Sequence, residues 1–198
     1  MTRGIVSLLL AYLICGVPFG YLLIRLKTGS DIRTAGSGNI GATNALRVGG
    51  RGAGIMTLLL DVAKGFGSVA LAGWLTHGSP AWSAGAAFCA VLGHCYPIYL
   101  RFRGGKGIAT GCGAYAWLAP LPMALTMVLF AIAVLMTRMV SVGSICAGIT
   151  LPLLIWWLAP DPFLIGSVAA SALLVISRHR ANIVRIVHGA EHRMNGGV

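Results

Sequence analysis

A short polar stretch, GSGNIGATN, occupies residues 36–44 between two long apolar segments. Its glycines permit positive φ angles, which let successive backbone N–H groups converge on an anion. Its hydroxyl and amide side chains add uncharged donors, and Arg47 follows with a planar, permanent positive charge that suits a phosphate group. A flexible linker is the alternative, but amides and hydroxyls beside an arginine favour a binding site. The expected anion contacts are Gly36, Ser37, Gly38, Asn39, Gly41, Thr43, Asn44 and Arg47.

A second polar stretch, RFRGGKGIAT, occupies residues 101–110 and leads directly into an apolar segment. Glycines surround Lys106, and the N–H groups at the start of the following helix would add to the positive charge of the lysine. A nucleotide-binding P-loop needs Ser or Thr directly after its lysine, where this chain has Gly107, so a nucleotide is not predicted. A general anion site is predicted instead, with Gly104, Gly105, Lys106, Gly107 and Thr110 as its contacts.

Two smaller polar pieces lie further along the chain. Ser141 and Ser144 stand at the start of an apolar segment, where either could cap a helix or the helix start could bind an anion. The G-x-S-x-G pattern around a serine nucleophile is absent from the sequence. In RHRANIVR, residues 178–185, His179 and Asn182 would share a helix face, and His can act as acid, base or hydrogen-bond donor near neutral pH.

The composition sets the class of protein. The chain is 57% hydrophobic and only 10% charged, with a mean hydropathy of +0.85, whereas soluble domains carry about 25% charged residues. An integral membrane protein is therefore predicted. The net charge of +11 suits nucleic acid, anionic lipid or an anionic substrate, but no basic segment interleaves aromatic residues as a nucleic-acid site would need. The spacing of cysteine, histidine and acidic residues predicts no metal site and no cofactor.

Apolar runs near the length of a membrane-spanning helix occupy residues 4–24, 53–76, 81–100, 108–136, 139–158 and 162–177. The first run is followed by no cleavage site and is expected to be retained as a span. The run at 108–136 is too long for one crossing of ~30 Å, and Pro120 and Pro122 predict a turn inside it. With two short helices there, every basic cluster falls on one side of the membrane, which identifies that side as cytoplasmic.

The expected fold is an all-α integral membrane protein with seven transmembrane helices, some of them short. The N-terminus would lie outside and the C-terminus in the cytoplasm. Residues 1–198 would form a single polytopic membrane domain, with cytoplasmic loops at about 25–52, 101–110, 137–144 and 178–198. This arrangement would gather the four polar pieces around one pocket for phosphorylated substrates at the cytoplasmic surface.

Two charged residues fall inside the second apolar run. Asp61 and Lys64 are separated by three positions, so they share a helix face and can form an ion pair. A charged pair within the membrane is a candidate functional site, and the alternative is a structural pair that locks helices together. The structural role is favoured, because neither residue lies in one of the glycine-rich stretches.

Three stretches in this order, GSGNIGATN, FRGGKGIAT and RHRANI, resemble the bacterial membrane glycerol-3-phosphate acyltransferases that use acyl phosphate. The resemblance extends to residues 18–20, 60–65 and 93–97. It implies a bacterial inner-membrane enzyme with a cytoplasmic site and no cofactor, embedded in membrane lipid. The enzyme would transfer a fatty acyl group from acyl phosphate to the 1-hydroxyl of sn-glycerol 3-phosphate, giving lysophosphatidic acid and phosphate for phospholipid synthesis. The peripheral enzyme that makes acyl phosphate would be a partner.

The resemblance also implies roles for single residues. Catalytic roles fall to Ser37, Arg47, Lys106, His179 and Asn182, a substrate contact to Ser144, and a structural role, such as a salt bridge with a nearby arginine, to Glu191. No histidine has an aspartate five positions later, which separates this chain from acyltransferases with an H-x-x-x-x-D pair. Direct transfer without an acyl-enzyme is expected. The proton acceptor is either His179 or, the favoured alternative, the donor phosphate, with His179 binding the acceptor phosphate.

Two other classes of protein stay open from the residues alone. A transporter for a phosphorylated solute would also carry anion sites on its cytoplasmic side, but it should show repeated halves with a site near the membrane midplane. A membrane phosphatase would require an essential nucleophilic histidine in a different arrangement.

Overall fold

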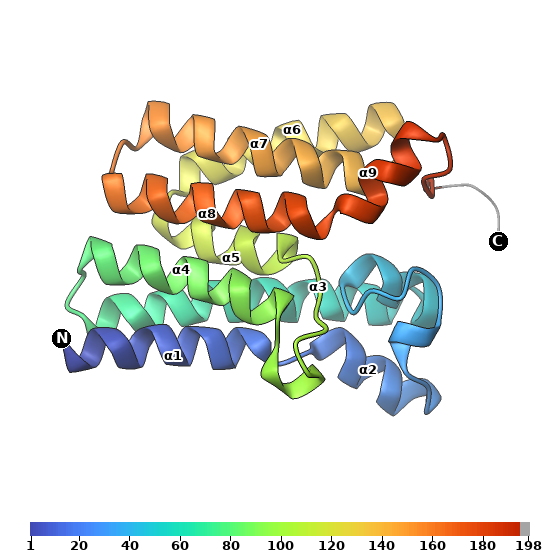
Figure 1. Ribbon diagram of the computed structural model, residues 1–198, viewed down its shortest axis with the longest axis horizontal. Coiled ribbons are helices and arrows are strands. Elements are labelled where there is room, and N and C mark those ends of the chain that lie inside the picture. The colour runs from blue at the N-terminus through green and yellow to red at the C-terminus, as the bar shows by residue number, and fades with distance from the viewer. Residues whose placement is uncertain (195–198) are drawn as a thin grey trace.

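The computed structural model describes residues 1–194, which fold into a bundle of helices aligned along the long axis of the molecule (Figure 1). No strand occurs within this range, so the prediction of an all-α fold is confirmed. The α-helices are α1 (Thr2–Gly16), α2 (Phe19–Thr28), α3 (Ala42–Leu75), α4 (Pro80–Cys95), α5 (Ile108–Leu118), α6 (Pro120–Thr137), α7 (Val140–Leu158), α8 (Pro162–Arg178) and α9 (Arg180–Val187). Short 3-10 helices span Ile32–Thr34 and Ile98–Leu100.

The helices form two groups with a short helix between them. In Figure 1, α1, α3 and α4 lie on one side, α6, α7 and α8 lie on the other, and α5 lies between the groups. The closest packing joins α3 to α5, where a Cβ atom on Gly65 would collide with the carbonyl of Thr110. Glycine at this position lets the two backbones approach closely, as at many helix contacts within membranes.

Prolines set two of the helix boundaries. Helix α5 ends at Leu118 and α6 begins at Pro120, so the turn predicted inside the run at 108–136 is confirmed. The first run, predicted to be continuous over 4–24, is divided, because α1 ends at Gly16 and α2 begins only after Pro18. Proline lacks the N–H that would continue the helical ladder, and it disfavours a helical conformation in the residue before it.

The connection predicted at about 25–52 is shorter in the structure than in the prediction. The irregular segment spans residues 29–41, which we call the first loop, and α3 already begins at Ala42. The sequence misled because residues 42–54 include several polar residues and, from Gly49 to Gly54, four glycines, which is unusual for a helix. Helix α3 is interrupted at Gly50, whose φ of 81° and ψ of −178° suit glycine alone.

The lengths of the helices bear on the number of membrane crossings. Among residues 1–194, five helical segments are long and apolar enough to cross a membrane, when α1 is counted with α2 and α4 with the 3-10 helix that follows it. The number is six if α8 and α9, bent by 56°, count as one. Helix α5 has 11 residues and is about 16 Å long, roughly half of the hydrocarbon thickness. The count of seven crossings and the orientation of the termini stay predictions.

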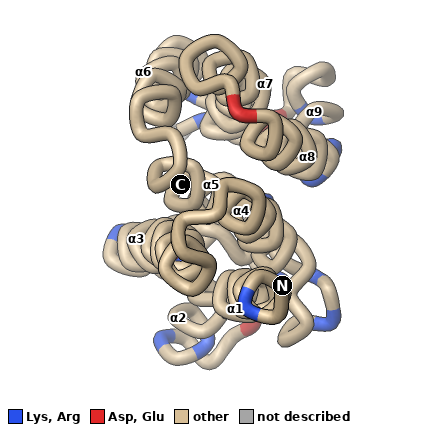
Figure 2. Tube along the Cα trace, turned by 90° about the vertical axis from the view of Figure 1, so that its left-hand side faces the viewer, with Lys and Arg blue, Asp and Glu red and all other residues tan. Residues whose placement is uncertain are grey.

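The four polar pieces lie at one end of the bundle. The first loop, the segment 101–107 that we call the second loop, the turn before α7 and the α8–α9 junction all lie opposite the N-terminus (Figure 1). Figure 2 looks onto the N-terminal end and shows acidic colour between α7 and α8 and basic colour at the start of α1. The predicted grouping of the four pieces at one end is confirmed.

Candidate active site

Asn44, a buried residue in the first turn of α3, shapes the first loop from the inside. Its Oδ1 accepts a hydrogen bond from the backbone N–H of Ser37 at 2.8 Å. Its Nδ2 donates to three backbone carbonyls, at 3.2, 3.1 and 2.9 Å, those of Ile32, Ala35 and Asn39. One side chain therefore fixes four points of the loop. A contact of Asn44 with substrate stays a prediction, and its amide is already engaged by the loop.

The loop presents two polar side chains at its surface. Gly36 and Gly38 have φ angles of 59° and 70°, and the turns they make leave Ser37 exposed between them. Arg47 is also exposed on α3. Within residues 1–194, neither the hydroxyl of Ser37 nor the guanidinium of Arg47 has a hydrogen-bond partner. Both are therefore available to a ligand, as the sequence predicts.

The N-terminus of α3 is also open toward this surface. Gly41 is the N-cap residue and supplies no side-chain hydrogen bond to the helix. Its own N–H donates to Oδ1 of Asn39 at 2.8 Å, which fixes the turn into the helix. Thr43, in the first turn, is half-buried. The predicted anion contacts at Asn39, Gly41 and Thr43 stay predictions, next to a helix start that suits an anion.

The second loop is held from outside, by residues of α4 and α8. The N–H of Gly105 donates to the carbonyl of His94 at 3.0 Å, and the N–H of Gly104 donates to the carbonyl of Cys95 at 3.2 Å. Arg178 donates from Nε to the carbonyl of Gly105 at 3.0 Å and from Nη2 to that of Gly104 at 2.9 Å. The sequence did not reveal these roles of His94 and Arg178. Their contacts connect residues about ten to seventy positions apart, and only their types, a histidine before the loop and an arginine at the end of α8, were visible.

The glycines of the second loop are required by lack of space and by backbone conformation. A Cβ atom on Gly105 would collide with the imidazole ring of His94, and one on Gly104 would collide with the carbonyl of the same residue. Gly107, the N-cap residue of α5, has a φ of 84°. Thr110, one turn into α5, is buried and lies 3.1 Å from Nδ1 of His94 through its Oγ1. Direct contacts of these residues with a ligand stay predictions.

Lys106 ends a chain of hydrogen bonds that joins three parts of the molecule. Its Nζ donates to Oδ1 of Asn182 at 2.5 Å, and Nδ2 of Asn182 donates to Oε1 of Glu191 at 2.7 Å. The carboxylate of Glu191 also accepts from Nε of Arg185 at 2.8 Å and from Oγ of Ser141 at 2.9 Å. The predicted salt bridge between Glu191 and a local arginine is confirmed, and the structure brings Lys106 and Asn182 together.

Positive charge exceeds negative charge around this chain. Burial lowers the pKa of Lys106 to about 8; Glu191 opposes this shift, and the nearby Arg185, Arg47 and Arg178 strengthen it. Burial tends to raise the pKa of Glu191, but hydrogen bonds from Asn182, Arg185 and Ser141 bring that pKa below its usual value. One ionised carboxylate therefore stands among a lysine and several arginines. Such a surplus of positive charge favours an anionic ligand.

His179 lies buried at the bend between α8 and α9. Its Nδ1 lies 2.8 Å from the carbonyl oxygen of Val175, which can only accept a hydrogen bond, so Nδ1 carries a proton. A neutral ring then has an unprotonated Nε2 that can accept a proton, and a charged ring has an Nε2–H that can donate to phosphate. Burial lowers the pKa of His179 to about 4, so the ring is neutral without substrate, and the binding role requires it to take up a proton when a phosphate arrives.

The serines at the start of α7 behave differently from each other. The N-cap residue is Met139 and the helix has no side-chain cap, so the alternative that Ser141 or Ser144 caps it is wrong. Oγ of Ser144 donates to the carbonyl of Val140 at 2.9 Å, one turn earlier in the same helix. Its contact with substrate stays a prediction, whereas the link from Ser141 to Glu191 was not visible in the sequence.

Comparison with known proteins identifies the family. Residues 5–189 match the family described as glycerol-3-phosphate acyltransferase. The glycerol-3-phosphate acyltransferase of Syntrophotalea carbinolica is 45% identical over 193 residues, and that of Geobacter sulfurreducens is 42% identical over 193 residues, with 98% of both chains covered in each case. The chain belongs to the glycerol-3-phosphate acyltransferase family.

This acyltransferase also shares its fold with solved structures. They are crystal structures of PlsY (YgiH), an integral membrane glycerol 3-phosphate acyltransferase. The glycerol 3-phosphate form has a TM-score of 0.93 and 33% identity, covering 97% of this chain and 96% of that chain. The lysophosphatidic acid form has a TM-score of 0.88 and 31% identity, covering 97% and 95%. Like them, this acyltransferase is a multi-pass membrane protein.

Proposed function

We propose that this acyltransferase moves a fatty acyl group from acyl phosphate to the 1-hydroxyl of sn-glycerol 3-phosphate, releasing lysophosphatidic acid and phosphate. The observation that carries the proposal is the half-buried Lys106, held by Asn182 among arginines at the polar end of a membrane bundle. The negative charges of two phosphate groups would balance the surplus positive charge there. The names of the related PlsY structures, with glycerol 3-phosphate and with lysophosphatidic acid, support the acceptor and the product.

A half-open apolar cavity supports an acyl chain as the group transferred. The cavity begins at Gly107 and Ile108, directly after Lys106, and lies among α4 to α8. Its walls include Cys112, Met127, Leu151, Val168, Ala172 and Val175. This apolar lining would accept the acyl chain of a donor from the bilayer without burying unpaired polar groups, although the transfer from lipid brings little hydrophobic gain. The phosphate of the donor would then lie at the second loop while its acyl chain enters this cavity.

The reaction proceeds in one transfer step. The 1-hydroxyl oxygen of the acceptor attacks the carbonyl carbon of the donor, a new ester bond forms, and the bond from carbon to the phosphate oxygen breaks. Acyl phosphate is already activated, so the enzyme mainly holds two anions close together. Lys106, Arg47 and Ser37 would neutralise or hydrogen-bond the phosphates and the developing oxyanion. No acyl-enzyme forms on this path.

The hydroxyl proton would pass to the departing phosphate, and His179 would bind the acceptor phosphate through Nε2. The alternative makes Nε2 of His179 the base. His179→Ala separates them: loss of affinity raises the KM for glycerol 3-phosphate and leaves kcat nearly unchanged, whereas loss of the base lowers kcat. A fall in kcat of about 100-fold or more would reject the donor phosphate as base.

The polar end would face the bacterial cytoplasm from the inner membrane. The loops and helix ends at this end carry most of the arginines and lysines, which the positive-inside rule assigns to the cytoplasm. Exposed tryptophans lie near the C-terminal ends of α3 and α7, which point away from the polar end. They are Trp74, Trp156 and Trp157, and tryptophan is common at a membrane interface. A cytoplasmic site would also meet the peripheral enzyme that supplies acyl phosphate.

One assay tests the proposed reaction. The purified protein in lipid vesicles receives acyl phosphate and glycerol 3-phosphate, and lysophosphatidic acid and phosphate are both followed. Equal amounts of the two products are expected, with about 10²- to 10³-fold less of both from Lys106→Ala. Phosphate release without lysophosphatidic acid would indicate a phosphatase instead. Acyl-coenzyme A as a second donor tests the assignment of the donor, and an equal rate with it would contradict acyl phosphate.

A further inference from the structure

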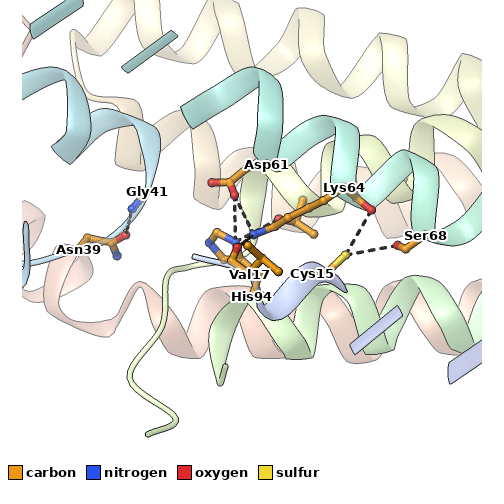
Figure 3. A network of polar contacts seen from close by, with 9 residues as sticks. Cys15, Val17, Asn39, Gly41, Asp61, Lys64, Ser68 and His94 are labelled. Atoms are coloured by element: carbon orange, nitrogen blue, oxygen red, sulfur yellow. Dashed lines mark hydrogen bonds and ion pairs between the residues drawn. The ribbon is translucent and has the colours of Figure 1, made fainter. Parts of the chain in front are cut away.

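A charged pair lies inside the bundle, where α3 packs against the α1–α2 break and the end of α4 (Figure 3). Asp61 and Lys64 of α3 are 1% and 6% exposed, and Nζ of Lys64 lies 2.8 Å from Oδ1 of Asp61. The structure confirms the predicted pairing. Burying such a pair is costly, and apolar side chains of similar size often leave a protein equally stable or more stable. The pair therefore calls for an explanation other than stability.

Lys64 connects the pair to the first loop. Its Nζ donates to the carbonyl of Val17 at 2.8 Å, at the point where Pro18 divides α1 from α2. The same ammonium lies 5.5 Å from the ring centre of Phe19. One residue later, a Cβ atom on Gly20 would collide with the carbonyl of Ile40 in the first loop. Lys64 thus fixes the start of α2, against which the first loop packs.

Asp61 connects the pair to the second loop. Its Oδ1 lies 3.7 Å from Nδ1 of His94, which Thr110 also contacts. Figure 3 shows Asp61, Lys64, Val17 and His94 gathered around this point. On its other side the ring of His94 fills the space against Gly105, and the carbonyl of His94 accepts the N–H of Gly105. The second loop therefore rests on a residue that faces the carboxylate.

We propose that Asp61, Lys64 and His94 are positioning residues that set the separation of the two loops. The proposal rests on the proposed function, in which each loop holds part of a two-substrate pocket. The hydroxyl and the carbonyl carbon react only when they are about 3–3.5 Å apart, and a displacement of 1 Å can cost about 100-fold in rate. Each loop keeps its own phosphate contacts when the separation changes. Loss of the pair thus lowers kcat much more than it raises KM.

The first experiment removes both charges together. In Asp61→Asn/Lys64→Met no unpaired charge is left buried, so the fold is retained. We expect kcat to fall about 10- to 100-fold and the KM for glycerol 3-phosphate to change by less than about 3-fold. The control is Asp161→Ala, which removes the N-cap hydrogen bond of α8 to Leu164 and lowers stability without touching either loop. Wild-type kcat in the folded double variant overturns the proposal.

The second experiment tests the contact between His94 and the loop. Gly105→Ala forces the loop away from the ring, and His94→Ala removes the three atoms nearest to the new methyl group, all of them in the imidazole ring. We expect kcat to fall about 100-fold in Gly105→Ala and about 10-fold in His94→Ala. The double variant should lose no more than Gly105→Ala alone. Multiplied losses in the double variant would mean that the ring does not hold the loop.

A distance measurement keeps this proposal separate from the proposed function. Spin labels at Thr34→Cys and Arg103→Cys, both exposed, report the separation of the two loops without any substrate. The distance distribution should shift or broaden in Asp61→Asn/Lys64→Met and stay unchanged in Asp161→Ala. A wild-type enzyme that makes no lysophosphatidic acid contradicts the proposed function only. An unchanged distribution in the double variant contradicts the positioning role only.

Discussion

The two loops at the polar end reach a fixed shape by different means. The first loop is organised by Asn44, a neighbour in sequence whose single amide binds four points of the loop. The second loop is organised from outside, by His94 below it and Arg178 beside it. The first leaves Ser37 exposed, and the second carries a lysine that is half-buried. One substitution at Asn44 can therefore disrupt the first loop. The second loop depends on contacts from several helices, so a single substitution should disrupt it less.

The largest effect is expected at the lysine of the second loop. Lys106→Ala removes the half-buried charge and leaves Asn182 without its donor, so kcat/KM should fall about 10²- to 10³-fold. Steady-state assays with both substrates check the result. Arg103→Ala, an exposed neighbour in the same loop, is the matched control and should change kcat/KM by less than about 3-fold. Equal losses in the two variants would mean that general positive charge, rather than this lysine, is required.

Asn44→Ala tests the internal support of the first loop. Several buried backbone groups lose their partner at once, each costing about 1–3 kcal/mol when left unsatisfied. We expect about 100-fold loss of kcat/KM together with a clear fall in melting temperature. Asn44→Asp keeps the acceptor for Ser37 but turns a carboxylate oxygen toward three carbonyl oxygens, so it should lose at least as much as Asn44→Ala. Full activity in Asn44→Ala would remove the contrast between the loops.

The pKa of Lys106 predicts an alkaline limb in the activity. Burial lowers this pKa to about 8, so the amine is charged below that pH and neutral above it. The value of kcat/KM should therefore decline above about pH 8 and be about 10-fold lower at pH 9 than its plateau. Lys106→Arg keeps its charge over this range, and its weaker activity should show no such limb. A limb that persists in that variant would assign the titration to another group.

Arg178→Lys is expected to have the smallest effect. Lysine keeps the charge but cannot donate to the carbonyls of Gly104 and Gly105 in the planar geometry of a guanidinium. Because the contacts with α4 still hold the second loop, kcat/KM should fall only about 5- to 10-fold. Kinetic assays beside Asn44→Ala give the comparison directly. A loss as large as that of Asn44→Ala would show that the second loop also depends on one side chain.

Much of the fold could be predicted from local patterns. The apolar runs predicted helices, Pro120 predicted the break between α5 and α6, and the basic residues placed the four polar pieces at one end. These features depend on short stretches of sequence or on summed charge. The start of α3 was predicted too late, because the packing of Asn44 into the first loop outweighs the polar residues and the glycines of the stretch 42–54.

The candidate site could be predicted by residue type but not by contact. The glycines, Lys106 and His179 were visible as chemistry that suits phosphate. The supports of the site were not, because Lys106 bonds a residue 76 positions away and Ser141 bonds Glu191 across 50 positions. Such pairs are brought together only by the packing of whole helices. The charged pair in α3 was visible, but its two connections run through backbone carbonyls and a histidine ring, which no spacing rule identifies.

Under the proposed function, the half-open apolar cavity behind the second loop would take its donor from the bilayer. The concentration of that donor is then measured per lipid molecule rather than per volume of water. An acyl phosphate that enters from the bilayer is available in proportion to its mole fraction among lipids, whereas glycerol 3-phosphate is available by its molarity in water. Adding inert lipid at fixed amounts of enzyme and donor should then slow the reaction, although the concentrations of both per sample volume stay the same. Under the proposed function, growth of the membrane would itself dilute the donor and slow the synthesis of new lipid.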